Sequence, residues 1–397
     1  ISAVSTGSQA MQLVTSLLVG LTTGVTVLLG QKIGEGRPDE AGSVVGSAIC
    51  LFVCVALALT ALLSALTKPF CRLLQAPEEA FVPTTQYVRI CSAGTLFIVA
   101  FNVIGSVFRG LGDSKMPLIT VAIACVTNIF GDLLLVDVFQ MGAAGAALAT
   151  VFAQAVSVIL SLFVIMRRKL PFTFRKEQLR FDRPLTAGIL RLGIPIALQD
   201  VLVGVAFLVI LAIVNSLGLL QSAGMGIAEK VCAFVMLLPS AFSQSVSAFV
   251  AQNTGAGKPE RAKKALRYSV AVSLCISVFV FYFNFFHGDL LAGIFANDHA
   301  VILEAADYLK AYAIDCLLTS FLFCFVGYFS GLGKTVFVMT QGILGAFGVR
   351  IPVSFAMSRL PNVRLFYIGL ATPCSTVVQV LLCLGYYAHL ARRERRA

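Results

Sequence analysis

The sequence predicts an all-α, polytopic membrane protein built from two parallel repeats of transmembrane helices. Of its 397 residues, 58% are hydrophobic and only 12% are charged, whereas a soluble domain carries about 25% charged residues. Apolar runs of about 20 residues recur, which is long enough to cross the hydrocarbon core of a bilayer as helices. The alternating ten-residue strands of a transmembrane β-barrel do not occur in the sequence, so helices are the expected elements.

An internal repeat with a constant offset of 221 residues supports two similar halves. One repeated motif reads Q-x-x-G-x-G-[K/R]-P-[D/E]-x-A, and a second reads F-x-G-L-G. A duplication in so apolar a chain is typical of transporters whose halves enclose a transport path. The matching segments are 31–41 with 252–262, 108–112 with 329–333, and Tyr87 with Tyr308.

Eleven spanning segments are expected, each an apolar run bounded by turn residues or charges. The turn at 31–41 separates the first two spans, the glycines at 110–112 separate the third from the fourth, and 137–142 separates the fourth from the fifth. The same punctuation recurs in the second half at 252–262 and 331–333. The expected spans are 8–30, 43–66, 85–108, 117–136, 143–166, 187–215, 223–250, 265–286, 305–329, 335–357 and 366–390.

The longest polar segment, 167–186, is basic and is expected to be a cytoplasmic linker. It separates an N-terminal bundle (1–166) from a C-terminal bundle (187–397). The N-terminal bundle has five spans and the C-terminal bundle has six, and the chain begins at Ile1 rather than Met. We therefore expect the first helix to be missing from a complete protein of twelve spans. Six spans per half would give both halves the same orientation.

The distribution of Lys and Arg predicts the orientation. They concentrate in the loops of one face and in the C-terminal tail, and only a few lie in the loops of the other face. The positive-inside rule places the basic face and the C-terminus in the cytoplasm of a bacterial cell, with the chain as a multi-pass protein of the cell membrane. Because the cations of this +11 chain lie in loops, its net charge does not indicate a nucleic-acid partner.

The repeated glycines are expected to be structural. In each first motif two glycines permit positive φ after a helix, and the following Pro begins the next helix. A nucleotide-binding P-loop at Gly333-Lys334-Thr335 is excluded, since Tyr328 stands where that motif needs Gly. The turn glycines are Gly34, Gly36, Gly110, Gly112, Gly255, Gly257, Gly331 and Gly333.

No enzymatic chemistry is indicated. The eleven cysteines lie mostly inside apolar runs and contain no C-x-x-C, so we interpret them as small core residues. The three histidines lie at span ends or in loops without metal-ligand spacing, and no resident cofactor or metal is expected.

The candidate functional residues are the few polar or ionisable groups inside spans, because each costs free energy there unless it is paired or hydrated. Asp315 is the first candidate, since no basic residue lies within four positions. It is expected to bind a proton or sodium, or else to be a buried, hydrogen-bonded acid or to pair with Arg350. Asp132 follows Asn128 by one helical turn, with bonding at a helix end as the alternative. Glu229 is not expected to pair with the adjacent Lys230. The full set is Asp315, Asp200, Gln199, Glu229, Asn128, Asp132 and Arg350.

The combination of motifs resembles the MATE (multidrug and toxic compound extrusion) family of the MOP flippase superfamily. The resemblance covers the whole chain. It rests on Q-x-x-G-x-G-[K/R]-P and F-x-G-x-G in each half, on Asn128 to Asp132 followed by the small-residue segment from Gly142 to Gln154, and on Leu192-Gly193-x-Pro195-x-x-x-Gln199.

The resemblance implies a V-shaped, monomeric antiporter that exports organic cations by alternating access, coupled to H⁺ or Na⁺. A sodium ion at Asp315 or Asp200 is one expectation, although each lies about one turn from the acids of the sodium-coupled branch, which leaves proton coupling open. Aromatic residues such as Phe207 are candidates to line a cavity for flat cations. A flippase for lipid-linked oligosaccharides of the same superfamily is the alternative, but such a cavity would be strongly basic.

Overall fold

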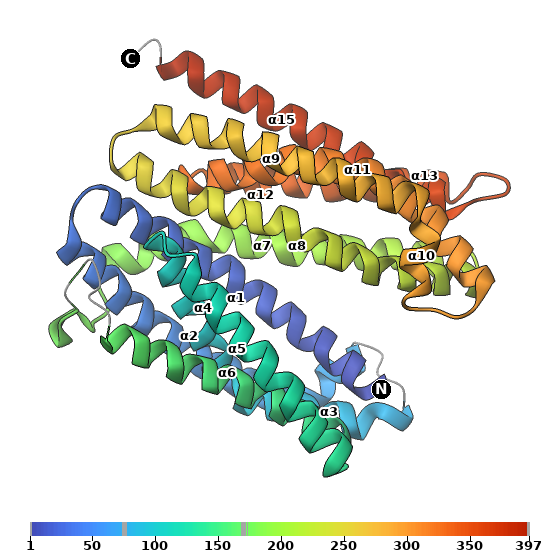
Figure 1. The fold of residues 1–397 in the computed structure, drawn as a ribbon, viewed down its shortest axis with the longest axis horizontal. Coiled ribbons are helices and arrows are strands. Elements are labelled where there is room, and N and C mark those ends of the chain that lie inside the picture. The colour runs from blue at the N-terminus through green and yellow to red at the C-terminus, as the bar shows by residue number, and fades with distance from the viewer. Residues whose placement is uncertain (1, 74–77, 168–171, 173, 395–397) are drawn as a thin grey trace. The chain divides into compact units, whose positions relative to one another are not determined.

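The computed structural model describes residues 2–73, 78–167, 172 and 174–394, and in these ranges the chain forms helices and no strand (Figure 1). The predicted linker and tail lie partly outside the described residues, at 168–171, 173 and 395–397. The helices are α1 (Ser2–Gly34), α2 (Pro38–Leu73), α3 (Glu78–Ala93), α4 (Thr95–Gly110), α5 (Lys115–Asp132), η1 (Leu133–Val138), α6 (Gly142–Arg167), η2 (Lys176–Gln178), α7 (Arg183–Asn215), α8 (Leu219–Gly255), α9 (Pro259–Phe286), α10 (Gly288–Gly293), α11 (His299–Gly331), α12 (Thr335–Ile343), η3 (Leu344–Arg350), α13 (Ile351–Met357), α14 (Leu365–Gly369) and α15 (Ala371–Glu394).

The all-α membrane architecture is confirmed. Ten helical segments of the described chain are long and apolar enough to cross a membrane, and the bent pair α3–α4 makes an eleventh. These segments coincide with the eleven predicted spans. The chain packs as two compact units: the first holds α1 to α6 and the start of α7 up to Ala197, and the second holds the rest of α7, α8 up to Thr254, and α9 to α15.

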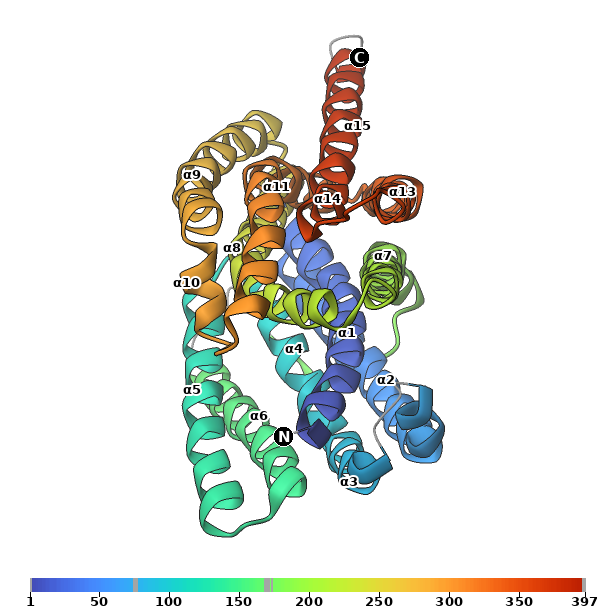
Figure 2. The ribbon, with the colours of Figure 1, turned by 90° about the vertical axis from the view of Figure 1, so that its right-hand side faces the viewer.

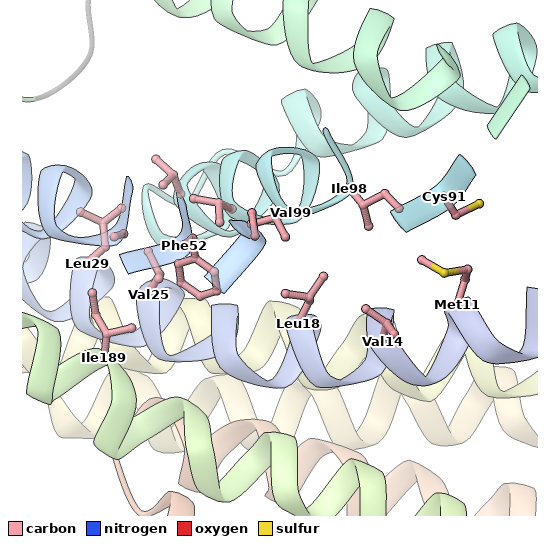
Figure 3. Close-up of a cluster of buried hydrophobic side chains, with 14 of the residues drawn as sticks. Met11, Val14, Leu18, Val25, Leu29, Phe52, Cys91, Ile98, Val99 and Ile189 are labelled. Carbon is pink, nitrogen blue, oxygen red and sulfur yellow. The ribbon is translucent and has the colours of Figure 1, made fainter. Parts of the chain in front are cut away.

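The first unit is organised around α1. This helix packs against α2, α3 and α4, and its buried side chains Leu18 and Val25 meet Phe52 and Val99 in one apolar core (Figure 3). The beginning of α7 lies directly on α1, since a Cβ added at Gly24 would lie only 2.2 Å from the Ile189 carbonyl oxygen. Residues without a side chain thus let the two backbones touch.

The second unit is organised around α11. Its sequence is apolar around the whole circumference, which is typical of a helix surrounded by protein. It packs against α9, α14 and α15, as Figure 2 also shows for α9 and α14. Gly327 brings it against α8, because an added Cβ there would lie 2.3 Å from the Ser243 carbonyl oxygen. The middle of α11 is therefore sealed from its surroundings.

The repeat is visible in the backbone. At an offset of 221 residues, α1 corresponds to α8, α2 to α9, and the pair α3–α4 to α11. Even a local irregularity is repeated: α2 has non-helical dihedrals at Leu66, and its counterpart His287 ends α9 with φ −129° and ψ 29°. The halves therefore share a backbone plan and not only motifs.

One pair of counterparts differs. The predicted span 85–108 is two helices, α3 and α4, bent by 55° at Gly94. The corresponding helix α11 is continuous, and the residue that corresponds to Gly94 is Asp315. A Cβ at Gly94 would lie 2.4 Å from a methyl group of Val151 on α6, so this position has no room for a side chain.

The predicted turns form, although each uses only one of its two glycines for positive φ. Gly36 and Gly257 have φ of 69° and 66°, and Pro38 and Pro259 begin the next helices. Gly112 and Gly333 have φ of 78° and 74°. The expectation of positive φ is wrong for Gly34 and Gly255, which are the helical last residues of α1 and α8. Gly110 and Gly331 likewise end α4 and α11 in helical conformation.

Substitution of two glycines of α8, Gly224 and Gly226, tests the contact between α8 and α11. An added Cβ would lie 2.6 Å from Glu304 Cβ on α11 at Gly224, whereas nothing lies within 4 Å of one at Gly226. Gly224→Ala is expected to destabilise the detergent-purified protein by about 1–3 kcal/mol through overpacking. Gly226→Ala should leave the melting temperature unchanged or slightly higher, because Ala favours a helix. Equal melting temperatures for the two variants would contradict the α8–α11 contact.

Candidate functional site

Asp315 lies near the middle of α11 and is only 1% exposed. Its Oδ1 has no hydrogen-bond partner among the described residues. The hydroxyl of Thr376, on α15, lies within hydrogen-bonding reach of the carboxyl group. That hydroxyl also donates to the Thr372 carbonyl oxygen at 3.1 Å. The hydrogen of a hydroxyl rotates, so Thr376 can donate to an ionised Asp315 or accept from a protonated one.

Arg350 is the basic residue whose charge acts on Asp315. It ends the π-helical segment η3, is 7% exposed, and lies over the ring of Phe207 on α7 at 4.8 Å from the ring centre. Its field reaches Asp315, but the two residues form no ion pair within 4.0 Å in the described structure. The sequence alternative in which Arg350 neutralises Asp315 as a direct pair is therefore wrong for this structure.

The irregular backbone at Arg350 has a local cause. Pro352 follows two residues later and has no N–H to donate to the preceding turn, which favours a wider turn in the helix. Such π-helical turns often occur at functional sites. Arg350 Nε has no hydrogen-bond partner among the described atoms, although it is buried.

Two tyrosines of α11 complete this polar cluster. Tyr308 and Tyr312 are buried, and their rings stack with centres 6.5 Å apart. Tyr308 also forms a side-chain hydrogen bond with Thr372 and interacts with the charge of Arg350. Sequence reasoning matched Tyr308 to Tyr87 in the repeat but did not name it as a site residue. The match of Tyr308 with Tyr87 in the repeat could have indicated it as a site residue.

Glu229 lies at the edge of the cluster on α8. It is half-buried and interacts electrostatically with Tyr308 and with Cys232 of its own helix. The adjacent Lys230 is exposed and lies 6.0 Å from the ring centre of Phe295. The two neighbours thus point apart, as expected from helix geometry.

Asp200 and Gln199 are not joined to Asp315 by any contact of the described residues. Gln199 packs on α12, where a Cβ added at Gly342 would lie 2.8 Å from its Cδ. Its Oε1 is buried and has no partner among the described atoms. Asp200, one residue later on α7, is half-buried. These residues remain a separate candidate position.

A second polar cluster lies inside the first unit. The Asn128 side-chain amide on α5 donates to the Thr150 hydroxyl on α6 at 3.5 Å, and Thr150 also forms a hydrogen bond with Tyr87 on α3. Asp132 interacts electrostatically with Tyr87, and its buried Oδ1 lacks a partner among the described residues. The cluster joins three helices, so Asn128 and Asp132 do more than cap a helix end.

Both tyrosines are anchored in the same way. Tyr87 bonds to a threonine of α6, and Tyr308 bonds to a threonine of α15, which is the counterpart of α6 in the repeat. Each unit therefore places one unpaired acid near a tyrosine–threonine pair inside apolar helices. The second unit adds a buried cation and a continuous helix through the site.

An ion pair fixes α11 close to its tyrosines. Arg364, just before α14, makes two hydrogen bonds to the Asp307 carboxylate, and the Phe366 N–H donates to the same carboxylate at 3.1 Å. The bond to Asp307 raises the pKa of the Arg364 guanidinium above its usual value. Asp307 precedes Tyr308 directly, so this pair holds the beginning of the polar cluster.

Comparison with known proteins identifies a family model, several relatives and solved structures that the chain matches. The family model MatE matches residues 1–134 and 195–356. A Bacillus subtilis protein named "Probable multidrug resistance protein YoeA" is 24% identical over 402 residues, an alignment that covers 100% of this chain and 87% of that protein. A Shewanella oneidensis protein named "FAD transporter" is 28% identical over 302 residues, covering 73% of this chain and 65% of that protein. A crystal structure of a MATE protein in complex with MaL6 superposes with a TM-score of 0.94 at 17% identity, covering 100% of this chain and 89% of the other.

Arg350 and Asp307 should respond oppositely to neutral substitution. Arg350 has no ion-pair partner in the described structure, so Arg350→Met should cost less than about 1 kcal/mol or stabilise the protein, because it removes the desolvation cost of a buried charge. Asp307→Ala should lower the melting temperature, because it leaves the Phe366 N–H and Arg364 without their acceptor. Thermal unfolding of both variants in detergent measures this contrast. A clear loss of stability in Arg350→Met, equal to that of Asp307→Ala, would contradict the site geometry.

Proposed function

Because the chain belongs to the MATE family, we propose that it is an exporter that exchanges organic cations for protons across the cell membrane. The observation that carries the proposal is the Asp315 carboxyl, which is buried within a membrane-spanning helix without an ion-pair partner in the described structure. A charged acid in such a place is costly, so its cheapest states are protonated or bound to a cation. The same group can then serve the driving ion and the cargo in turn.

The environment of the carboxyl suits the binding and release of a proton. The Thr376 hydroxyl lies within hydrogen-bonding reach of Asp315 and can rotate between Asp315 and the Thr372 carbonyl. An ionised Asp315 can accept the hydrogen of this hydroxyl, and a protonated Asp315 can donate to its oxygen. The field of Arg350 helps the ionised form, so neither form is prohibitively costly. An acid balanced in this way can bind and release a proton during a transport cycle.

The exchange follows from competition for one acid. A cationic cargo stabilises the ionised carboxylate and displaces the proton, and a proton displaces the cargo. Aromatic faces such as Phe207 and Tyr312 suit flat cations. The multidrug relative in Bacillus subtilis agrees with a broad range of such cargoes.

A flavin nucleotide is the second candidate cargo. One relative is named an FAD transporter, and Arg350 offers a buried guanidinium whose Nε lacks a partner among the described atoms. Guanidinium groups bind phosphate well. The flippase alternative receives less support, because a pyrophosphate cavity needs several cations, and Arg350 is the one buried Lys or Arg side chain in the described chain.

Asp315→Asn tests the role of the acid. In inverted membrane vesicles, accumulation of ethidium by this variant should fall to the background of vesicles without the protein, because the amide cannot exchange a proton. Asp289→Asn, which changes an exposed acid of α10, is the matched control and should transport normally. Normal transport by Asp315→Asn at equal expression would remove Asp315 from the mechanism.

The driving ion is tested with purified protein in vesicles, using ethidium and FAD as cargoes in turn. Cargo should enter inverted vesicles when their lumen is acidic, and adding cargo should speed the decay of the pH gradient. A sodium gradient of the same size should have no effect. Sodium-driven uptake without proton movement would refute proton coupling, and uptake of FAD but not ethidium would favour the flavin nucleotide. Arg350→Met should impair FAD transport more than ethidium transport.

A further inference from the structure

The first unit contains an apolar groove that none of the acids described above lines. It has a volume of about 340 Å³ and is formed by α2, α4, α6 and two phenylalanines of the linker, Phe172 and Phe174. Every residue that lines it is aliphatic or aromatic. The volume falls within the range of small-molecule sites, but such sites carry a few polar groups that this groove lacks. A ligand of this groove must therefore be a hydrocarbon where it touches the protein.

The groove has the length and exposure of a lipid-facing channel. Its lining on α4 runs from Leu96 to Leu111, which at the rise of an α-helix spans roughly 22 Å. The hydrocarbon layer of one leaflet is about 15 Å deep, half of the bilayer core. Val53, Leu96 and Leu162 line the groove and are exposed, so it opens sideways from the spanning helices.

One end of the groove is bounded by a linker segment that is firmly attached to α2. The Gln178 side-chain amide donates to the Asp39 carbonyl at 3.0 Å, and the Ser47 hydroxyl donates to the Arg180 carbonyl at 3.4 Å. A Cβ added at Gly46 would lie 2.0 Å from the Gln178 carbonyl oxygen. Gly46 thus admits the linker backbone and Gly42 admits the Gln178 side chain, where such small-residue pairs often admit a second helix.

This attachment places unneutralised cations at the end of the groove. Arg175 and Lys176 directly follow the lining residue Phe174, are exposed, and form no ion pair among the described residues. Glu177 is exposed beside them. Of the acids of the nearby α1–α2 turn, Glu35 and Glu40 pair with Lys32 and Arg37, whereas the exposed Asp39 forms no ion pair among the described residues. This end lies on the basic face that the sequence predicts to be cytoplasmic.

We propose that this groove holds an acyl chain of an anionic phospholipid of that leaflet, with its phosphate headgroup at Arg175 and Lys176. Apolar contact along α4 supplies affinity for the chain, and the two cations supply selectivity for the headgroup. The site is distinct from the exchange site at Asp315, and it ties a lipid to the segment that connects the two halves of the chain.

The absence of Trp from the sequence allows a direct test by fluorescence quenching. Phe174→Trp puts a single reporter in the groove, and Leu381→Trp puts one on the exposed face of α15. Each protein is placed in phosphatidylcholine vesicles that contain either phosphatidylglycerol or phosphatidylcholine with brominated chains. The groove reporter should prefer phosphatidylglycerol by about fivefold or more, given the attraction of two cations near a membrane surface. The α15 reporter should show a ratio near one.

Two further variants separate the headgroup from the chain. Adding Arg175→Gln and Lys176→Gln should reduce the ratio at the groove reporter to about one. Ala100→Phe fills the groove and should weaken quenching there by both lipids, while quenching at the α15 reporter stays unchanged and thereby confirms the fold. Equal quenching by the two lipids at both reporters, a preference that survives the double glutamine change, or quenching that survives Ala100→Phe would overturn the proposal. None of these outcomes depends on transport.

Discussion

A carboxyl group enclosed by apolar helices, with a hydroxyl group beside it and no counter-ion in direct contact, is the constraint around which the second unit is built. Asp315 is kept from water by α8, α9 and α15, and Gly327 removes the side chain that would hold α8 away. The neighbours that matter come from other helices: Thr376 from α15 and Arg350 from η3. Because a lone charge in such surroundings is expensive, small changes in charge nearby can move the proton. The packing of the helices around Asp315 therefore determines how readily its carboxyl group binds and releases a proton.

The two halves share one arrangement of helices but differ at the position that is Gly94 in the first half and Asp315 in the second. Tyr87 and Tyr308 are counterparts, and each is held by a threonine of the corresponding helix. Gly94 and Asp315 are also counterparts, but the first marks a 55° bend packed tightly on Val151, whereas the second lies in a continuous helix. The two similar bundles therefore differ at this pair of positions, where one has a bent helix and the other a buried acid.

Local patterns explain why much of the fold could be predicted. Spans follow from runs of apolar residues, and the turns follow from glycine and proline chemistry at Gly36 and Pro38, which needs no knowledge of the rest of the chain. The bend at Gly94 could not be predicted, because glycine is common inside membrane helices and only the contact with Val151 explains its presence. For the same reason the sequence could place Asp315 first among the acids but could not identify its neighbours, because Thr376 and Tyr308 become partners only through tertiary packing. The attachment of the linker to Gly42 and Gly46 likewise depends on contacts between distant segments.

The exchange of a proton for cargo at Asp315 can be observed without following transport. Infrared difference spectroscopy on the protein in lipid vesicles detects the C=O stretch of a protonated carboxylic acid, and the Asp315→Asn variant identifies which part of that band belongs to this residue. Addition of an organic cation should remove the Asp315 band as the proton leaves, with a matching release of protons to the medium. A band that is unchanged when cargo binds, or one that is the same in the variant, would show that this carboxyl does not exchange its proton for cargo.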